Sequence, residues 1–415
     1  MSMADREFDL VLFGATGFVG GLTAEYLAGA APADARIALA GRSPDKLTTV
    51  RDGLGAAAAN WPLLVADSSD QAALDALAAR TRVVVTTVGP YLRYGLPLAQ
   101  ACAQAGTHYA DLTGEPPFIR ECIDRFTEQA VGTGAKIVNS CGYDSIPSDL
   151  NVYQLYRRSV EDNTGELTDT TMVAWLKGGV SGGTVDALRA MMESVAADPA
   201  NGRIMTHPYS LSPDPAVEPD LGRQSDQALM RASAIDPSLH GWVATFIMGP
   251  HNTKMVRRSN GLLGWAYGKN FRYREVMSAG SSPVAPLAAA GLAGGIVAGV
   301  AATAVLSRAA AGRRLLDRVL PKPGTGPSEK SRRNGWFTSK TFTRTTSGAK
   351  YVATFSGTGD PGYQATAVML GESGLCLAFD ELPALAGVLT PATAMGDALI
   401  ERLRAAGMTI EVDRA

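Results

Sequence analysis

Near its start the chain reads Phe8-Asp9-Leu10-Val11-Leu12-Phe13-Gly14-Ala15-Thr16-Gly17-Phe18-Val19-Gly20. A mostly apolar run, typical of a buried strand, leads directly into three glycines spaced three residues apart. Such glycines permit a tight turn, a close approach of the backbone to a phosphate, and close packing of the next helix on the sheet. The alternative is a tight turn without a ligand. The residues that we expect to contact a bound dinucleotide are Gly14, Thr16, Gly17, Phe18, Val19 and Gly20.

Strands and helices alternate over the residues that follow. The pattern predicts six strands, at 8–13, 36–40, 63–66, 82–88, 108–112 and 136–139. Helices are expected between them, at 18–28, from Pro44 onward with Ser43 as N-cap, and at 70–80, 95–105 and 117–131. This alternation over about 140 residues is typical of a doubly wound parallel sheet. We therefore expect an α/β protein with a Rossmann fold.

The pattern changes after about residue 150 and predicts a second, α+β domain. Strands are expected at 169–176, 242–248, 336–347 and 349–357, and helices at 364–372 and 392–405. Residues 207–224 are polar and rich in proline, which favours a long surface loop. A chain of 415 residues has room for two or three domains. The predicted division is a nucleotide-binding domain at 1–150, an α+β substrate domain at 151–390, and a C-terminal helix at 391–415 packing back on the first domain.

The composition argues against several classes of function. A net charge of −2 gives no basic field for nucleic acid. The four cysteines and four histidines are scattered, without C-x-x-C or H-E-x-x-H spacing, so we expect no metal and no disulfide framework. The polar start of the chain lacks the apolar segment of a signal peptide. We therefore expect a cytoplasmic protein.

The end of the second predicted strand bears on the choice between NAD and NADP. An acidic residue there would bind the ribose 2′-OH of NAD, but the sequence has Arg42 and Ser43 instead. Arg42 can pair with a 2′-phosphate, Ser43 can donate to it, and Lys46 lies one helical turn further on. Asp67, after the third strand, can accept from the adenine amino group or cap the next helix. The pattern favours NADP(H), and the alternative is an ordinary exposed arginine.

Polar residues gather where the fourth, fifth and sixth strands end. Gly89 and Pro90 follow the fourth strand, and we expect the backbone there to run along the nicotinamide ribose. Segments 109–115 and 139–149 follow the fifth and sixth strands and are rich in proton-donating and proton-accepting groups. Loop capping is the alternative, above all for Asp144, Ser148 and Asp149. The candidate proton donors are Tyr91, Tyr109 and Tyr143.

Several of these segments together resemble the saccharopine dehydrogenase-like oxidoreductases. They are 14–20, 40–43, 88–91, 109–115, 141–149, 181–184 and 387–392. Within that family the chain most resembles the mycobacterial trans-acting enoyl reductases, which are associated with reducing double bonds of polyketide-type acyl chains in lipid synthesis. The resemblance implies NADPH as hydride donor. It implies as substrate an acyl or polyketide intermediate that a synthase can carry.

Two other classes of oxidoreductase need particular residues, which can be looked for in the sequence. Short-chain dehydrogenases need a Tyr-x-x-x-Lys pair, and none occurs in the sequence. A saccharopine dehydrogenase needs arginines for the substrate carboxylates, and the few between 150 and 250 stand in no obvious binding loop. That activity stays open as an alternative. A non-catalytic NADP-binding protein at a membrane or lipid body is the other.

Residues 278–307 carry no charged side chain and are followed by a basic stretch. This segment has room to span a bilayer, but its small residues are weak for insertion. Peripheral membrane contact through 278–322, on the inner face of the plasma membrane, is one expectation, and a buried helix is another. The glycine-rich stretch 178–184 has two interpretations too, a second anion or carbonyl site and a plain turn. A homo-oligomer is also compatible with the sequence.

Overall fold

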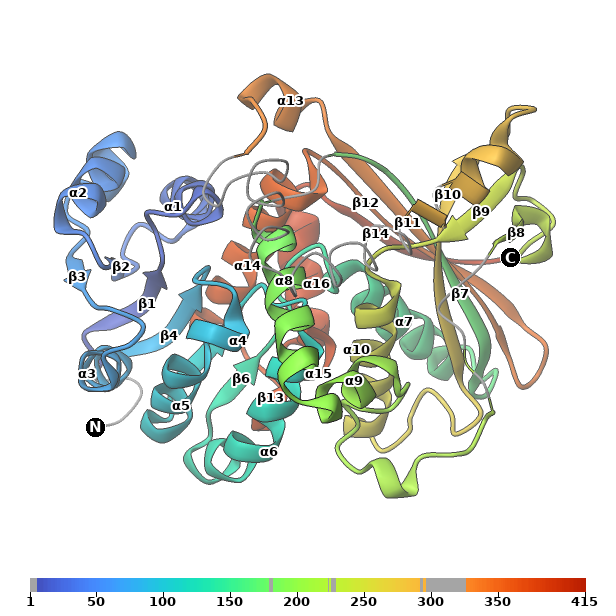
Figure 1. Ribbon diagram of the computed structural model, residues 1–415, viewed down its shortest axis with the longest axis horizontal. Helices are drawn as coiled ribbons and strands as arrows, with labels where there is room; N and C mark the ends of the chain where they lie inside the picture. The colour runs from blue at the N-terminus through green and yellow to red at the C-terminus, as the bar shows by residue number, and fades with distance from the viewer. Residues whose placement is uncertain (1–5, 179–181, 223, 225–228, 292–293, 296–325) are drawn as a thin grey trace.

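The computed structural model describes residues 6–415 apart from 179–181, 223, 225–228, 292–293 and 296–325. Two seven-stranded sheets stand side by side (Figure 1). The first is parallel throughout and has the strand order β13-β6-β5-β4-β1-β2-β3. Its strands are β1 (Phe8–Phe13), β2 (Ile37–Gly41), β3 (Leu63–Val65), β4 (Thr81–Thr86), β5 (His108–Ala110), β6 (Lys136–Val138) and β13 (Gly387–Leu389). The predicted doubly wound α/β fold is therefore confirmed.

Helices cover both faces of the first sheet. They are α1 (Phe18–Ala30), α2 (Pro44–Gly53), α3 (Gln71–Arg80), α4 (Tyr91–Tyr94), α5 (Leu96–Ala105), α6 (Pro116–Thr133) and α14 (Thr366–Phe379). Helices α1 and α14 pack on the face to which Leu10 and Leu12 point. Helices α3, α5 and α6 pack on the opposite face, with Val11 and Phe13. All four of these strand side chains are buried, as expected for a parallel sheet.

The second sheet is mixed and has the order β14-β12-β11-β7-β10-β9-β8. Its strands are β7 (Leu167–Lys177), β8 (Leu229–Arg231), β9 (Trp242–Thr245), β10 (Arg272–Gly280), β11 (Trp336–Thr345), β12 (Lys350–Thr358) and β14 (Thr409–Arg414). Helices α7 (Ile146–Glu161) and α10 (Gly249–Leu262) pack against it. The predicted hairpin of β11 and β12 is confirmed, with Gly348 at a φ of 85° in its turn.

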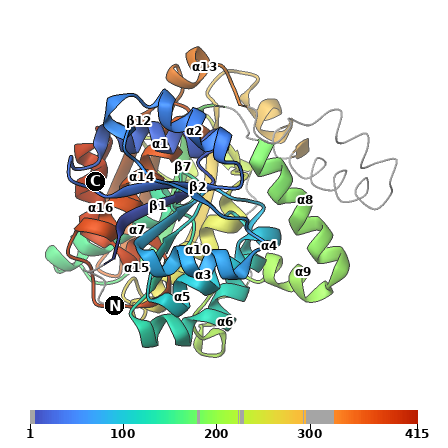
Figure 2. The same ribbon diagram turned by 90° about the vertical axis from the view of Figure 1, so that its left-hand side faces the viewer.

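The remaining helices lie at the rim and the end of the chain. They are α8 (Gly182–Ala197), α9 (Pro199–Thr206), α13 (Glu329–Arg333), α15 (Pro391–Ala394) and α16 (Gly396–Ala405). Helices α8 and α9 form an outer pair beside α4 and α6 (Figure 2). The single helix expected at 392–405 is two, because the chain breaks at Met395 and Gly396, where Gly396 has a φ of 47°.

The end of the chain contributes to both sheets. Strand β13 completes the first sheet beside β6, and β14 pairs with β12 in the second. Helix α14 also lies on the first sheet, so residues 366–389 pack with the nucleotide-binding strands rather than with the second sheet. The division into domains at 150 and 390 stays a prediction.

The uncharged segment 278–307 is described only in part. Its first residues, 278–280, end strand β10, and most of the stretch 278–322 lies outside the described residues. Among the helices of the described ranges, none is long and apolar enough to cross a membrane.

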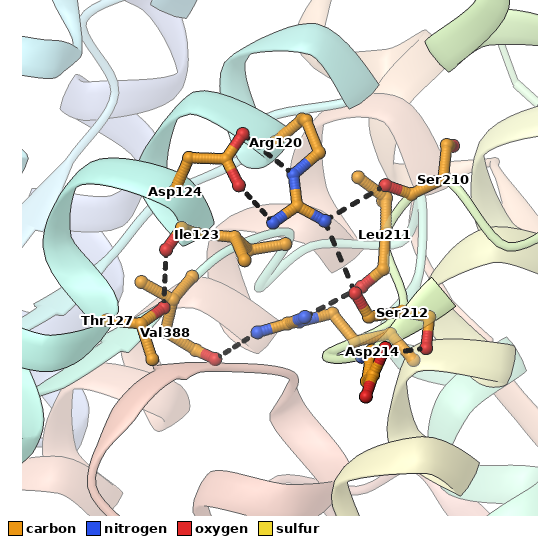
Figure 3. A network of polar contacts seen from close by, with 10 residues as sticks. Arg120, Ile123, Asp124, Thr127, Ser210, Leu211, Ser212, Asp214 and Val388 are labelled. Carbon is orange, nitrogen blue, oxygen red and sulfur yellow. Dashed lines mark hydrogen bonds and ion pairs between the residues drawn. The ribbon is translucent and has the colours of Figure 1, made fainter. Parts of the chain in front are cut away.

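The sequence predicts a surface loop at 207–224, but in the structure this loop does not lie wholly at the surface. Its residues 209–212 are buried, with Leu211 fully enclosed. Two guanidinium groups explain this burial, since they take up the backbone carbonyls that a buried loop must satisfy. Arg258 of α10 donates to the carbonyls of Leu211 (2.7 Å) and of Val388 in β13 (2.5 Å). Arg120 of α6 donates to Ser210 and Ser212, both at 3.2 Å, and pairs with Asp124 (Figure 3).

Removing the Arg120 guanidinium is expected to loosen this loop. Arg120→Ala leaves the carbonyls of Ser210 and Ser212 without these donors, and the free energy of unfolding falls by about 1–2 kcal/mol. Arg125→Ala in the same helix is the control, because Arg125 pairs with Glu121 at an exposed position and costs less than about 0.5 kcal/mol. Urea unfolding of the two variants measures the difference. Equal losses would contradict the loop-anchoring role.

Candidate active site

The turn after β1 depends on two of its glycines. Gly14 has a φ of 92°, and its carbonyl accepts from the Thr87 hydroxyl at 3.1 Å. A Cβ on Gly14 would lie 2.7 Å from the Val88 side chain. A Cβ on Gly20 would lie 2.1 Å from the Gly14 carbonyl oxygen. Both positions therefore exclude any side chain, which holds α1 close against the strand ends.

The N-terminus of α1 is open to a ligand. Gly17 is its N-cap, and within the described part of the chain no side chain caps it. Thr16 and Gly17 are exposed, while Phe18 and Val19 are partly buried. Uncapped N–H groups at an exposed glycine turn are the arrangement that binds a dinucleotide pyrophosphate. The residues present thus fit the predicted cofactor.

The end of β2 presents cationic groups beside that turn. The Arg42 side chain is 78% exposed, and its Nε lies 4.0 Å from an Asp67 carboxylate oxygen. Ser43 caps α2, as expected, by accepting from the Lys46 N–H at 3.5 Å. Asp67 does not cap α3, because Asp70 does so. Asp67 instead accepts from the Ser69 backbone and hydroxyl, which lowers the pKa of its carboxyl.

The loops after β4 and β5 are joined by hydrogen bonds. The Tyr91 hydroxyl donates to the Thr86 carbonyl and accepts from the Leu112 N–H, both at 3.1 Å. The buried Glu115 carboxylate accepts from the N–H groups of Tyr91 (2.8 Å) and Leu92 (2.9 Å) at the start of α4. Burial raises the pKa of Glu115 to about 7. These contacts fix the backbone at Gly89 and Pro90, directly before Tyr91.

The loop after β6 is tied to the loop after β5 in the same way. Asp111 accepts from the Asn139 amide (2.8 Å) and from the Ser140 N–H (2.9 Å). Burial raises the pKa of Asp111 to about 6. The Ser140 hydroxyl donates to the Thr113 carbonyl at 2.7 Å and lies 3.1 Å from Nε2 of His251. Burial lowers the pKa of His251 to about 3, so this imidazole is neutral at pH 7.

The three tyrosines singled out from the sequence lie in different environments. Tyr109 is fully buried in the core against α5 and α6. Tyr143 is buried beside Phe337 of β11, with ring centroids 4.9 Å apart. Tyr91 already uses its hydroxyl both as donor and as acceptor. Burial raises the pKa of all three hydroxyls, so each is protonated at pH 7.

One carboxyl group at this edge stands apart, and the sequence left it open between a proton donor or acceptor and a helix cap. Asp144 is partly buried and does not cap α7, whose N-cap is Ser145. Among the described residues, its carboxylate has no hydrogen-bond partner and no ion pair. It lies near Gly114, where an added Cβ would be 4.0 Å from its Oδ2 and 3.4 Å from the Met248 side chain. Burial raises the pKa of Asp144 to about 6.

Other polar groups at this end of the sheet hold neighbouring helices and loops together. Asp149 accepts from the Ala392 N–H at 2.8 Å and from the Ser259 hydroxyl, which joins α7 to α10 and α15. The second glycine-rich stretch, 178–184, lies partly outside the described residues; its Gly178 packs against Asp360 and Pro361. No group of metal-ligating side chains occurs in the described ranges.

A parallel sheet with an open glycine turn, cations after β2 and a polar edge over β4–β6 defines a nucleotide-dependent oxidoreductase. Residues 10–138 match the model of the saccharopine dehydrogenase NADP binding domain, and NADP(H) is the cofactor. The chain is 54% identical to a trans-acting enoyl reductase of Mycobacterium tuberculosis, with 100% of both chains covered. It is 53% identical to a trans-acting enoyl reductase of Mycobacterium ulcerans, again with 100% of both covered. The chain belongs to this family of saccharopine dehydrogenase-like oxidoreductases.

A solved structure agrees with the fold. The saccharopine dehydrogenase (L-Glu forming) of Saccharomyces cerevisiae superposes with a TM-score of 0.56, covering 98% of this chain and 99% of that one. The two sequences are 12% identical, so the likeness concerns the architecture of the two sheets and not the substrate. The resemblance noted from the sequence motifs is thereby confirmed for both the family and the fold.

Proposed function

We propose that the protein is a trans-acting enoyl reductase that reduces a carbon–carbon double bond of an acyl or polyketide intermediate carried on a synthase. The names of its relatives support this activity. The observation that carries the proposal is Asp144, a carboxyl with a pKa near 6 and no hydrogen-bond partner among the described residues, at the edge over β5 and β6. A reductase of this kind needs a proton source beside the nicotinamide, and we assign that role to Asp144.

The proposed cofactor contacts follow the path of a dinucleotide across the strand ends. The bound cofactor supplies the hydride. Backbone N–H groups at the start of α1 bind the pyrophosphate, and the cations after β2 bind the 2′-phosphate. The proposed contact residues are Gly14, Thr16, Gly17, Phe18, Val19, Gly20, Arg42, Ser43, Lys46, Asp67, Gly89 and Pro90.

The proton step assigns a role to Asp144. With hydride added to the β-carbon of the enoyl thioester, the Asp144 carboxyl protonates the α-carbon, and the carboxylate then regains a proton from water. The tyrosines stay alternatives as donors. We rank Asp144 first because Tyr91 has both hydroxyl functions occupied and Tyr109 lies wholly in the core. Met248 is partly buried and, like Asp144, lies close to Gly114, where it offers apolar contact to an acyl chain.

The activity is tested by incubating the protein with deuterium-labelled NADPH and an enoyl thioester of pantetheine. We expect a saturated product with one deuterium on the β-carbon, detected by mass spectrometry. A parallel incubation with saccharopine and NADP⁺ tests the dehydrogenase alternative. The reverse reaction, with NADPH as the reductant, is measured as well. Turnover of saccharopine without turnover of any enoyl thioester would overturn the proposal. Tight NADPH binding with neither reaction would favour a non-catalytic protein.

Arg42 is expected to set the preference for NADPH over NADH. Arg42→Ala removes a charged partner of the 2′-phosphate, so the Kd of NADPH rises about tenfold while that of NADH stays within about twofold. Titration followed by nicotinamide fluorescence measures both constants. Arg51→Ala, at the far end of α2, is the control and leaves both unchanged. An equal effect of Arg42→Ala on the two cofactors would contradict the assignment.

A further inference from the structure

Phe18, the first residue of α1, is enclosed by residues from a distant part of the chain. Its ring meets Tyr363 edge-on, with centroids 5.1 Å apart. The Arg332 guanidinium lies over the same ring, 5.1 Å from its centroid. A Cβ on Gly326 would lie only 2.4 Å from the ring. The glycine turn of the first sheet is thus in contact with the segment 326–334 that leads into the second sheet.

Arg332 is held in place by its own backbone and by one side-chain contact. Its carbonyl accepts from the Asp360 N–H at 2.8 Å, next to the end of β12. Its Nη1 donates to the Pro327 carbonyl at 2.8 Å. The bond from Asp360 ties α13 to the end of β12 in the second sheet, on the same side of the molecule as α1 (Figures 1 and 2).

Among the described residues, no carboxylate neutralises the charge of Arg332. Its neighbour Arg333 pairs with Glu329, but in the described part of the chain Arg332 has no carboxylate within ion-pair distance. Its buried Nε has no hydrogen-bond partner in the described ranges. Arg332 as a whole is only partly buried, and a guanidinium without a carboxylate partner can pair with an anion.

We propose that Arg332 binds the pyrophosphate of the dinucleotide and so makes the second part of the chain a component of the cofactor site. The inference rests on the proposed cofactor contacts at the Gly14–Gly20 turn. The N–H groups at the start of α1 face the pyrophosphate, and Phe18 is the first residue of that helix. A guanidinium on the ring of Phe18 therefore lies near the diphosphate. The 2′-phosphate belongs to the other side of the turn, beside Arg42 at the end of β2.

This placement predicts which ligands are affected when the charge is removed. Arg332→Gln is expected to raise the Kd of NADPH and of NADH by the same factor, about tenfold, because both contain the pyrophosphate. Adenosine 2′-phosphate lacks the pyrophosphate, so its Kd stays within about twofold. Arg333→Gln is the matched control and leaves all three constants unchanged. Isothermal titration of the full chain gives each Kd, and thermal unfolding checks that each variant is folded.

The other possible results of these titrations would each contradict the inference for a different reason. A loss confined to NADPH would place Arg332 at the 2′-phosphate, and a loss shared by all three ligands would make its role structural. Either result, or unchanged binding of both dinucleotides, overturns the inference. If Arg332→Gln fails to fold, Arg332→Lys takes its place, because it keeps the charge and is expected to retain most of the affinity for both dinucleotides. A rise of about tenfold in the Kd of NADH for Arg332→Lys would contradict the proposal. Failure of the unaltered protein to bind either dinucleotide would instead overturn the cofactor site.

Discussion

Asp144→Asn is expected to lower kcat for enoyl reduction by about 100- to 1,000-fold, because the amide cannot supply the proton. The Kd of NADPH should change by less than about twofold, since Asp144 follows β6 and lies away from the glycine turn. Stopped-flow oxidation of NADPH gives the rate, and titration gives the Kd. Tyr143→Phe, one residue away, is the comparison. A large loss in Tyr143→Phe with full activity in Asp144→Asn would return the role to the tyrosine.

The same assignment predicts a pH dependence with a definite sign. Burial holds the pKa of Asp144 near 6, above its usual range. The donor must be protonated, so kcat is highest below pH 6 and falls about tenfold per unit above it. In Asp144→Asn this dependence should disappear along with most of the rate. A rate that rises between pH 6 and 8 in the unaltered protein would contradict Asp144 as the acid.

Gly20→Ala is expected to abolish NADPH binding and to cost about 3 kcal/mol of unfolding free energy. The added Cβ would lie 2.1 Å from the Gly14 carbonyl oxygen, which also accepts from Thr87 and from the Gly17 N–H. That oxygen cannot move without opening the turn, so α1 must shift away from the sheet. Chemical denaturation and NADPH titration measure the two effects.

Gly29→Ala in the same helix is the matched control. Nothing lies within 4 Å of a Cβ at Gly29, so alanine adds helix propensity without a clash. We expect unfolding free energy to rise by about 0.5–1 kcal/mol and NADPH affinity to stay unchanged. If both variants lowered stability alike, the effect of Gly20→Ala would come from the helix and not from its contact with Gly14.

The first sheet could be predicted where the sequence signal is local. The sequence predicts both ends of strand β1 and the first residue of α1, because an apolar run followed by spaced glycines specifies strand, turn and helix together. Ser43 and Pro44 likewise marked the start of α2. The hairpin of β11 and β12 followed from Ser347 and Gly348 at its turn.

Other parts of the fold and of the site depend on long-range contacts that no local sequence pattern indicates. Strand β13 has three residues and forms only because β6, some 250 positions earlier in the chain, offers a free edge. The burial of Leu211 depends on Arg258, and nothing in a polar loop indicates such a partner. Asp144 could not be singled out as a site residue from the sequence, because an aspartate before a helix is equally typical of a cap. The raised pKa and the lack of a partner that distinguish it exist only in the folded protein.

The strands contributed by the last residues have a consequence for biosynthesis. While the ribosome is still adding residues 387–414, β6 and β12 each lack a neighbour on one side. During that time β6 and β12, which are interior strands of the finished sheets, are edge strands, and exposed strand edges recruit other chains. Pairing β13 with β6 also joins segments about 250 residues apart in sequence, which is slow. A chain cut before residue 387 would then be lost to aggregation or proteolysis and would not survive as a smaller nucleotide-binding fragment.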